Sequence, residues 1–137
     1  MKVVIDTNVV VSGLLRPAGP PGEIVRMVPT ADWGVCFDSR ILGEYRGVLA
    51  RPKFRSISAG EADRFLEFVE KRGYLVNPIS LIEDLPDPDD NMFLEVAIGG
   101  NVEYLVTGNL KHYPPDKRHG IRVVSPAEFL REWRGRH

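Results

Sequence analysis

Residues Lys2–Asn8 read KVVIDTN and carry the clearest indication of the fold. Its three consecutive β-branched residues, VVI, show no alternation with polar residues, a pattern typical of a central parallel strand that is buried on both faces. The run ends at Asp6, and open α/β sheets bind their ligands at the carboxyl ends of such strands. Aspartate is also a favoured helix N-cap, so capping of the following helix explains Asp6 equally well when it is taken alone.

Length and composition fit a single domain, which we expect to span residues 1–137. The chain is 43% hydrophobic and 27% charged, with a net charge of -1, as is typical of globular proteins. This balance excludes binding of nucleic acid through bulk positive charge, but it leaves room for a local basic patch. No apolar run has the length of a membrane span or the flanks of a secretion signal, so we expect no membrane partner and a cytoplasmic location.

Strand and helix patterns alternate along the rest of the chain. Further strands are predicted at residues 33–37, 74–76, 104–106 and 120–124, and helices at 7–15, 23–28, 38–50, 58–73, 92–99 and from 125 onward. Residues 16–22, rich in Pro and Gly, are predicted to be a loop. Ser58 with Glu61, and Ser125 with Glu128, have the spacing of capping boxes at two helix starts. The alternation predicts an α/β fold with a largely parallel sheet and right-handed crossovers.

Polar groups recur at places comparable to that of Asp6. Asp87 and Asp90 stand in an acidic stretch just before a predicted helix, and Asn109 follows the fourth predicted strand. Each of these positions is at the carboxyl end of a strand or the amino end of a helix, and in a parallel sheet all of them face the same rim. Either of the two later aspartates alone is also explained as a helix N-cap.

Glu44 joins this group from a helix. It comes three residues after Ile41 and four before Val48, so it lies on or beside the buried face. A carboxylate there must be paired, hydrogen-bonded or bound to a cation, because an isolated buried charge is too unfavourable. One interpretation is that Glu44 extends its carboxylate to the edge of this face or pairs with Arg40 or Arg51, and ligation of a metal ion is the other.

Several carboxylates that meet at one rim can all stay ionised only if a cation neutralises them. Oxygen ligands without a set of His or Cys partners select Mg²⁺ or Mn²⁺ in place of zinc. Such an ion activates a water molecule and stabilises the charge that develops on a phosphate oxygen. The residues therefore predict a divalent-metal site suited to phosphodiester or phosphate-ester chemistry.

Four motifs follow one another along the chain: VIDTN with SGLL (residues 4–15), EY with VL (44–49), DPDDN with FLEVA (87–97) and YLVTGN (104–109). In this order they resemble the motifs of PIN domains, most nearly those of the branch of toxins from prokaryotic toxin–antitoxin pairs that includes the VapC-type toxins. The resemblance covers nearly the whole chain. It implies a three-layer α/β/α fold with a five-stranded, largely parallel sheet, and a Mg²⁺- or Mn²⁺-dependent ribonuclease. It also implies an RNA substrate, an antitoxin partner and a homodimer.

The resemblance assigns roles residue by residue. Asp6 matches the first acid of the family, Glu44 the second and Asp90 the third, so these three are the predicted catalytic residues and metal ligands. Asp87 matches a further acid beside the third and is predicted to be an additional ligand. Thr107 matches a small hydroxyl residue, and we assign it to substrate binding together with Asn8.

The chain departs from the family's pattern at Asn109, where many members have Asp after Thr-Gly. The neutral amide oxygen of Asn109 can still reach a hard cation, so we expect one well-held ion and at most a weak second one. Lys111 and His112 follow, and they either place positive charge near a scissile phosphate or form a solvated turn. We assign Asn109, Lys111 and His112 to substrate binding.

The leading hypothesis is a metal-dependent endoribonuclease in which water attacks phosphorus in line. The alternative is a catalytically weak or inactive PIN-like module that binds RNA or a protein partner; the missing fourth acid favours it and the other acids count against it. A phosphatase with Asp6 as nucleophile is disfavoured, because Asn8 stands where a second acid is expected. Two runs of basic residues cover positions 46–55 and 111–119. Each run either attracts the phosphates of a nucleic acid or is simply a solvated surface.

Overall fold

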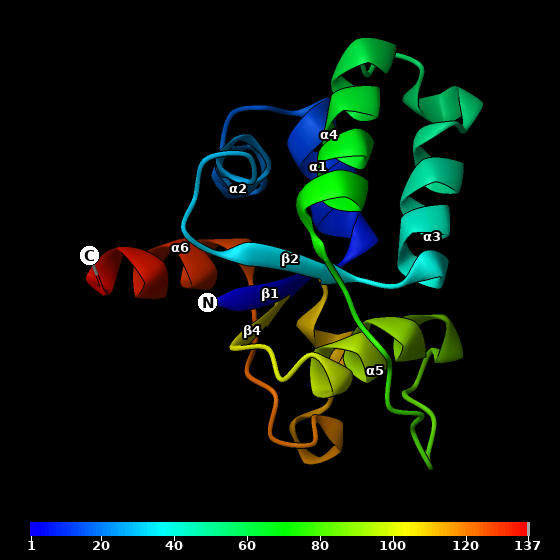
Figure 1. Ribbon diagram of the computed structural model, residues 1–137, viewed down its shortest axis with the longest axis vertical. Helices are drawn as coiled ribbons and strands as arrows, with labels where there is room; N and C mark the ends of the chain where they lie inside the picture. The colour runs from blue at the N-terminus through cyan, green and yellow to red at the C-terminus, as the bar shows by residue number, and fades with distance from the viewer. Residues whose placement is uncertain (137) are drawn as a thin grey trace.

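The computed structural model describes residues 1–136, which form a five-stranded sheet flanked by helices (Figure 1). The strand order is β3-β2-β1-β4-β5, and every neighbouring pair is parallel. The strands are β1 (Lys2–Ile5), β2 (Gly34–Phe37), β3 (Tyr74–Leu75), β4 (Tyr104–Val106) and β5 (Val123–Val124). β1 lies at the centre, and its last three residues are fully buried. The central parallel strand predicted from KVVIDTN is confirmed.

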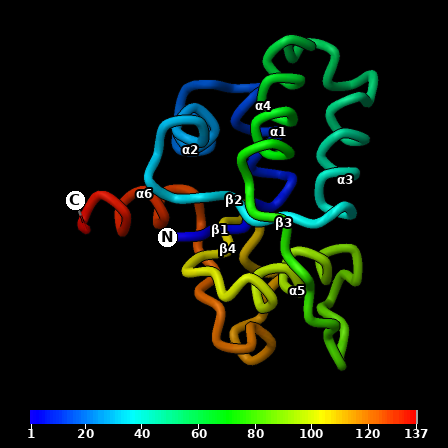
Figure 2. The backbone as a smooth tube through the Cα atoms, in the orientation of Figure 1, coloured from blue at the N-terminus to red at the C-terminus, as the bar shows by residue number. Residues whose placement is uncertain are grey.

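Six α-helices accompany this sheet within the described residues: α1 (Thr7–Leu15), α2 (Pro20–Met27), α3 (Ser39–Leu49), α4 (Ala59–Arg72), α5 (Asn91–Gly99) and α6 (Pro126–Gly135). α1 to α4 lie on one face of the sheet and α5 on the other, while α6 packs against α2 and β4 (Figures 1 and 2). Two short 3₁₀ turns border the rim described below, η2 (Pro88–Asp90) and η3 (Leu110–His112). The three-layer α/β/α fold with a parallel five-stranded sheet is confirmed.

α2 begins earlier than the sequence predicts, inside the segment that we expected to be a loop. Its first residues are Pro20 and Pro21, and proline is well suited to a first helical turn because its φ is already helical and its missing N–H is not needed there. α2 also lies very close to α1. A Cβ atom at Gly13 would come within 2.5 Å of the carbonyl oxygen of Pro21, so this approach requires glycine.

The last strand is shorter than predicted. The sequence favours residues 120–124, whereas β5 consists of Val123 and Val124 alone. Gly120 has a φ of 80° and His119 a φ of 52°, and these left-handed conformations are incompatible with an extended strand. β3 is likewise a two-residue edge strand, and Leu75 is 74% exposed.

The two predicted capping boxes have different outcomes. At α6 both halves form: the N–H of Glu128 donates to Oγ of Ser125, and the N–H of Ser125 donates to the carboxylate of Glu128, both at 3.1 Å. At α4 only Oγ of Ser58 accepts a bond, from the N–H of Glu61 at 3.4 Å.

None of the helices described in residues 1–136 combines the length and the apolar character that a membrane crossing requires.

Candidate active site

Asp6 directly follows the carboxyl end of β1 and is buried, with 4% of its surface exposed. Its side chain makes no capping hydrogen bond to α1. Instead, its Oδ2 accepts hydrogen bonds from Oγ1 of Thr107 and from the phenol of Tyr113, both at 3.0 Å. These two donors come from the segment after β4, a hundred residues along the chain. The carboxylate is therefore held chiefly by the segment after β4, although the backbone of Asn8 in the first turn of α1 also stabilises its charge.

Burial raises the pKa of Asp6, and the hydrogen bonds from Thr107 and Tyr113 oppose that rise because they stabilise the charged form. The negative charge of Asp6 also helps to raise the pKa of both Glu44 and Asp90, although burial is the larger cause in each case. Asp6 thus lies within electrostatic reach of both Glu44 and Asp90.

Glu44 projects from α3 and is half-buried. Its carboxylate accepts a hydrogen bond from Oγ1 of Thr7, at the start of α1. No ion pair involving Glu44 is found within residues 1–136. The guanidinium of Arg40 is bound instead to Asp38 at 2.8 Å and to Glu95 at 2.7 Å. The interpretation of Glu44 as a partner of Arg40 is therefore wrong.

Asp87 and Asp90 bracket the turn η2 and behave differently. Oδ1 of Asp87 accepts the N–H of Asp89 at 3.0 Å, so this residue does cap the turn. Asp90 makes no capping hydrogen bond with its side chain, and it is 9% exposed. Burial, followed by the charge of Asp6, raises the pKa of Asp90 to about 6.

His112 lies between Asp90 and Asn109. Its Nδ1 is 2.8 Å from Oδ2 of Asp90, and its Nε2 is 2.8 Å from the amide nitrogen of Asn109. Carboxylate oxygens of Asp87 and Asp90 and a ring nitrogen of His112 all lie within 4.8 Å of one another. Within residues 1–136, these three side chains form a compact set of possible metal ligands. The set includes His112, which we assigned to substrate binding from the sequence.

The remaining predicted residues surround this rim. The N–H of Asn109 donates to Oγ1 of Thr107 at 3.0 Å, which ties the loop after β4 to the residue that holds Asp6. Oδ1 of Asn8 accepts the N–H of Gly108 at 3.0 Å, so the start of α1 and the same loop are joined. Lys111 is exposed beside them.

A family model described as PIN domain matches residues 2–111, four-fifths of the chain. The chain belongs to the PIN domain family. It is similar to MJ1680, an uncharacterised protein of Methanocaldococcus jannaschii, with 29% identity over an alignment of 143 positions that covers 97% of this chain and 92% of that protein.

Two solved structures share the fold of this PIN domain. VapBC2 from Rickettsia felis, in a structure bound to a DNA fragment from their promoter, matches with a TM-score of 0.58 and 16% identity, over 91% of this chain and 98% of that one. FitAcB from Neisseria gonorrhoeae matches with a TM-score of 0.53 and 15% identity, over the same shares. At these identities the likeness concerns the fold alone, and it agrees with the predicted architecture.

Glu44 borders two grooves on the surface of this PIN domain. One, with a volume of about 420 Å³, runs between α1 and α3 and is also lined by Arg16 and Arg51. The other, of about 370 Å³, lies between α3 and η2 with α5, and Arg40 and Glu95 line it. A phosphate that approached Glu44 along the first groove would meet two guanidinium groups.

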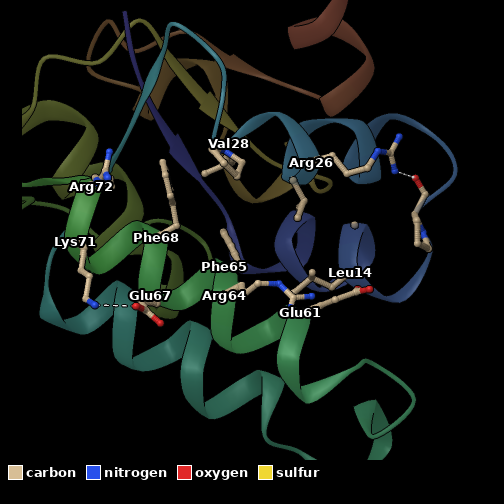
Figure 3. A pocket seen from close by; sticks show the side chains of 14 residues that line it. Leu14, Arg26, Val28, Glu61, Arg64, Phe65, Glu67, Phe68, Lys71 and Arg72 are labelled. Atoms are coloured by element: carbon tan, nitrogen blue, oxygen red, sulfur yellow. Dashed lines mark hydrogen bonds and ion pairs between the residues drawn. The ribbon is translucent and has the colours of Figure 1, made fainter.

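A larger cavity of about 910 Å³ lies between α4 and the α1–α2 pair (Figure 3). Side chains such as Leu14, Phe65 and Phe68 give it an apolar lining, and Arg64 and Arg72 stand among its charged residues. None of the predicted catalytic or metal-binding residues lines it. The candidate active site of the PIN domain is therefore the acidic rim and not this larger hollow.

Sequence reasoning missed Tyr113 and Thr7, which hold Asp6 and Glu44. Tyr113 is fully buried although it stands in a loop just before two prolines. A large aromatic residue in a polar, Pro-rich segment was the available signal that this loop folds back onto the core. Thr7 offered no comparable signal, because a threonine in a first helical turn is ordinary.

Proposed function

We propose that this PIN domain is a Mg²⁺- or Mn²⁺-dependent endoribonuclease. The observation that carries the proposal is the position of Asp6, which Tyr113 and Thr107 hold at the end of β1 and whose charge acts on both Glu44 in α3 and Asp90 in η2. A fold gains no stability from placing like charges together. Such a cluster is therefore suited to binding a cation.

The donor set fits a hard divalent cation. We propose that Asp87 and Asp90, which lie together, hold it with Asp6 and Glu44, which lie outside the compact set that the first two form with His112. All four would bind through carboxylate oxygens, which Mg²⁺ and Mn²⁺ accept. Oδ2 of Asp90 is buried, and no hydrogen bond of regular geometry satisfies it within residues 1–136, as expected of an atom that has a cation as its partner. When bound, the cation supplies an activated water and neutralises charge on the phosphate.

The protein's own groups orient this site. Tyr113 and Thr107 fix the carboxylate of Asp6, and Thr7 fixes that of Glu44. Because these donors stabilise the ionised forms, they help both carboxylates to stay charged in a partly buried place. The donors are set before a substrate arrives, so little reorganisation is needed during the reaction.

RNA would approach through its phosphates. Arg51 lines the groove beside Glu44 and belongs to the first basic run, which we propose to attract the backbone. We propose that Asn8, Thr107, Asn109, Lys111 and His112 contact the nucleotide around the cleaved bond, as they surround the acidic rim.

We also propose that the chain is the toxin of a toxin–antitoxin pair, with a protein antitoxin as partner, as a homodimer in the cytoplasm. The likeness of its fold to those of VapBC2 and FitAcB supports the toxin and antitoxin part of this proposal. We propose further that residues 1–137 act as a single domain.

Labelled RNA incubated with the pure protein tests the proposed activity. We expect endonucleolytic fragments with Mg²⁺ or Mn²⁺ and none with EDTA. Binding of RNA without cleavage under every metal condition would contradict the proposal and would favour a non-catalytic PIN-like module, for which Asn109 in place of the fourth acid is the supporting observation.

A further inference from the structure

We propose that His112 is a metal ligand, and that Asp87, Asp90 and His112 form a mixed oxygen and nitrogen site that selects Mn²⁺ over Mg²⁺. This inference deepens the proposed function, because it concerns a cation at the same rim and shares Asp90 with the carboxylate cluster. It replaces the expectation of an all-oxygen site, which rested on the absence of a histidine partner in the sequence pattern, and it gives His112 a role at the cation beside its proposed contact with the nucleotide.

The spacing of the three side chains suits one small cation. Their ligand atoms all lie within 4.8 Å of one another. Divalent cations of this size bind carboxylate oxygen and imidazole nitrogen at about 2.0–2.2 Å, so ligands on opposite sides are roughly 4 Å apart. Small side-chain movements are enough to bring the three groups into one coordination shell.

The contact between Asp90 and His112 is unusual for a plain ion pair. Oδ2 of Asp90 is buried and lies 2.8 Å from Nδ1 of His112, and this contact lowers the pKa of Asp90, yet its geometry falls short of a regular hydrogen bond within residues 1–136. Two such atoms that face the same space at this distance resemble neighbouring ligands of one cation. A satisfied ion pair would instead direct an N–H at the carboxylate oxygen.

Asn109 is placed to control which nitrogen of His112 carries the proton. A metal-binding histidine donates its other ring N–H to an acceptor, and Nε2 of His112 faces the amide of Asn109 at 2.8 Å. The oxygen and nitrogen of an amide exchange places when the group rotates by half a turn. With its oxygen toward Nε2, Asn109 accepts that N–H and leaves the lone pair of Nδ1 for the cation.

An imidazole ligand changes which ion the site prefers. Nitrogen suits first-row transition metals, whereas Mg²⁺ is bound through oxygen and water. Replacing one oxygen position by His112 therefore favours Mn²⁺. His112 then supplies a ligand where the carboxylate of the family's fourth acid is missing at position 109. This imidazole ligand is neutral, and it discriminates between Mn²⁺ and Mg²⁺.

Pulsed electron paramagnetic resonance of the full chain with Mn²⁺ alone tests the assignment, because a coordinated imidazole imposes a nitrogen modulation on the metal's signal. The variants are His112→Gln and the control His119→Asn; His119 is exposed and has a left-handed backbone that Asn tolerates. We expect the modulation in the natural protein and in His119→Asn, and its loss in His112→Gln. Binding of Mn²⁺ without nitrogen modulation, or a modulation that persists in His112→Gln, overturns the proposal.

Calorimetry gives the second readout and needs no RNA. His112→Gln should weaken Mn²⁺ binding by about 10-fold or more and change Mg²⁺ binding by about 2-fold or less. An equal loss for both ions contradicts selectivity. RNA cleavage is scored separately: nitrogen coordination without cleavage contradicts only the proposed function, and cleavage by a protein whose Mn²⁺ shows no nitrogen modulation contradicts only this inference.

Discussion

The phenol of Tyr113 donates a hydrogen bond to Oδ2 of Asp6 at 3.0 Å, across 107 positions of the chain. Burial and the nearby carboxylates hold the pKa of Tyr113 far above its usual range, so the group remains a donor at every physiological pH. A permanent donor keeps the central carboxylate oriented.

Tyr113→Phe removes this donor and little else. We expect a loss of about 1–2 kcal/mol in the free energy of unfolding, since a buried carboxylate loses one hydrogen bond. Urea denaturation at pH 7 measures it. Tyr74→Phe is the matched control, because Tyr74 is half-exposed. Equal stabilities of the two variants would show that the bond to Asp6 contributes nothing.

Asp90 gives the metal-free protein a defined pH dependence. Its pKa is raised from 3.8 to about 6, chiefly by burial and then by the charge of Asp6, so the folded state binds a proton that the unfolded state has released. Stability must therefore fall as pH rises through this window and level off above about pH 6. Thermal melts in EDTA should show this fall for the natural protein relative to Asp90→Asn. A difference that is flat or rises with pH would contradict it.

Glu44→Gln separates a metal ligand from a structural acid. Glu44 has no ion-pair partner within the described residues, and burial raises its pKa. Loss of its charge should therefore leave the stability of the metal-free protein unchanged or slightly higher, while metal affinity falls by about 10-fold or more. Calorimetric titration and a melt in EDTA decide, with the exposed Glu61→Gln as control. Lower stability with unchanged metal affinity would make Glu44 structural.

Asn109→Asp restores the charge that many PIN domains carry at this position. The new carboxylate would accept the Nε2–H of His112 and add negative charge beside Asp90, so we expect divalent cations to bind about 10-fold more tightly. Asn101→Asp adds the same charge at an exposed position with a left-handed backbone. Calorimetric titration measures the affinity of each variant, and binding in Asn109→Asp that is no tighter than in this control would contradict this account. Lower RNA cleavage by Asn109→Asp would assign the Asn109 amide to the substrate.

The sequence predicted those features that depend on local pattern. The buried run of β1, the alternation of strands and helices and the capping box at Ser125 all follow from neighbouring residues, and each is confirmed. The bounds of α2 and β5 were wrong, because prolines can begin a helix and because Gly120 turns the chain just before the strand.

The site was predictable only as a set of acids. Glu95 shows why: it is buried in α5 and joins Arg40 across 55 positions, and its other oxygen accepts the N–H of Leu81 at 2.9 Å. No spacing rule pairs residues so far apart. The contact of His112 with Asp90 escaped prediction for the same reason, since their proximity depends on how two loops meet above the sheet.

The chemical ends of the RNA fragments distinguish attack by a water molecule from attack by the ribose 2′-hydroxyl. If a water held at the acidic rim attacks phosphorus, the fragments carry no 2′,3′-cyclic phosphate, because the ribose 2′-hydroxyl takes no part. We predict such fragments from the natural protein with Mn²⁺, and none from Asp6→Asn, which keeps the shape of the side chain and its fold. Cyclic-phosphate ends, or the same fragments from Asp6→Asn, would contradict the account.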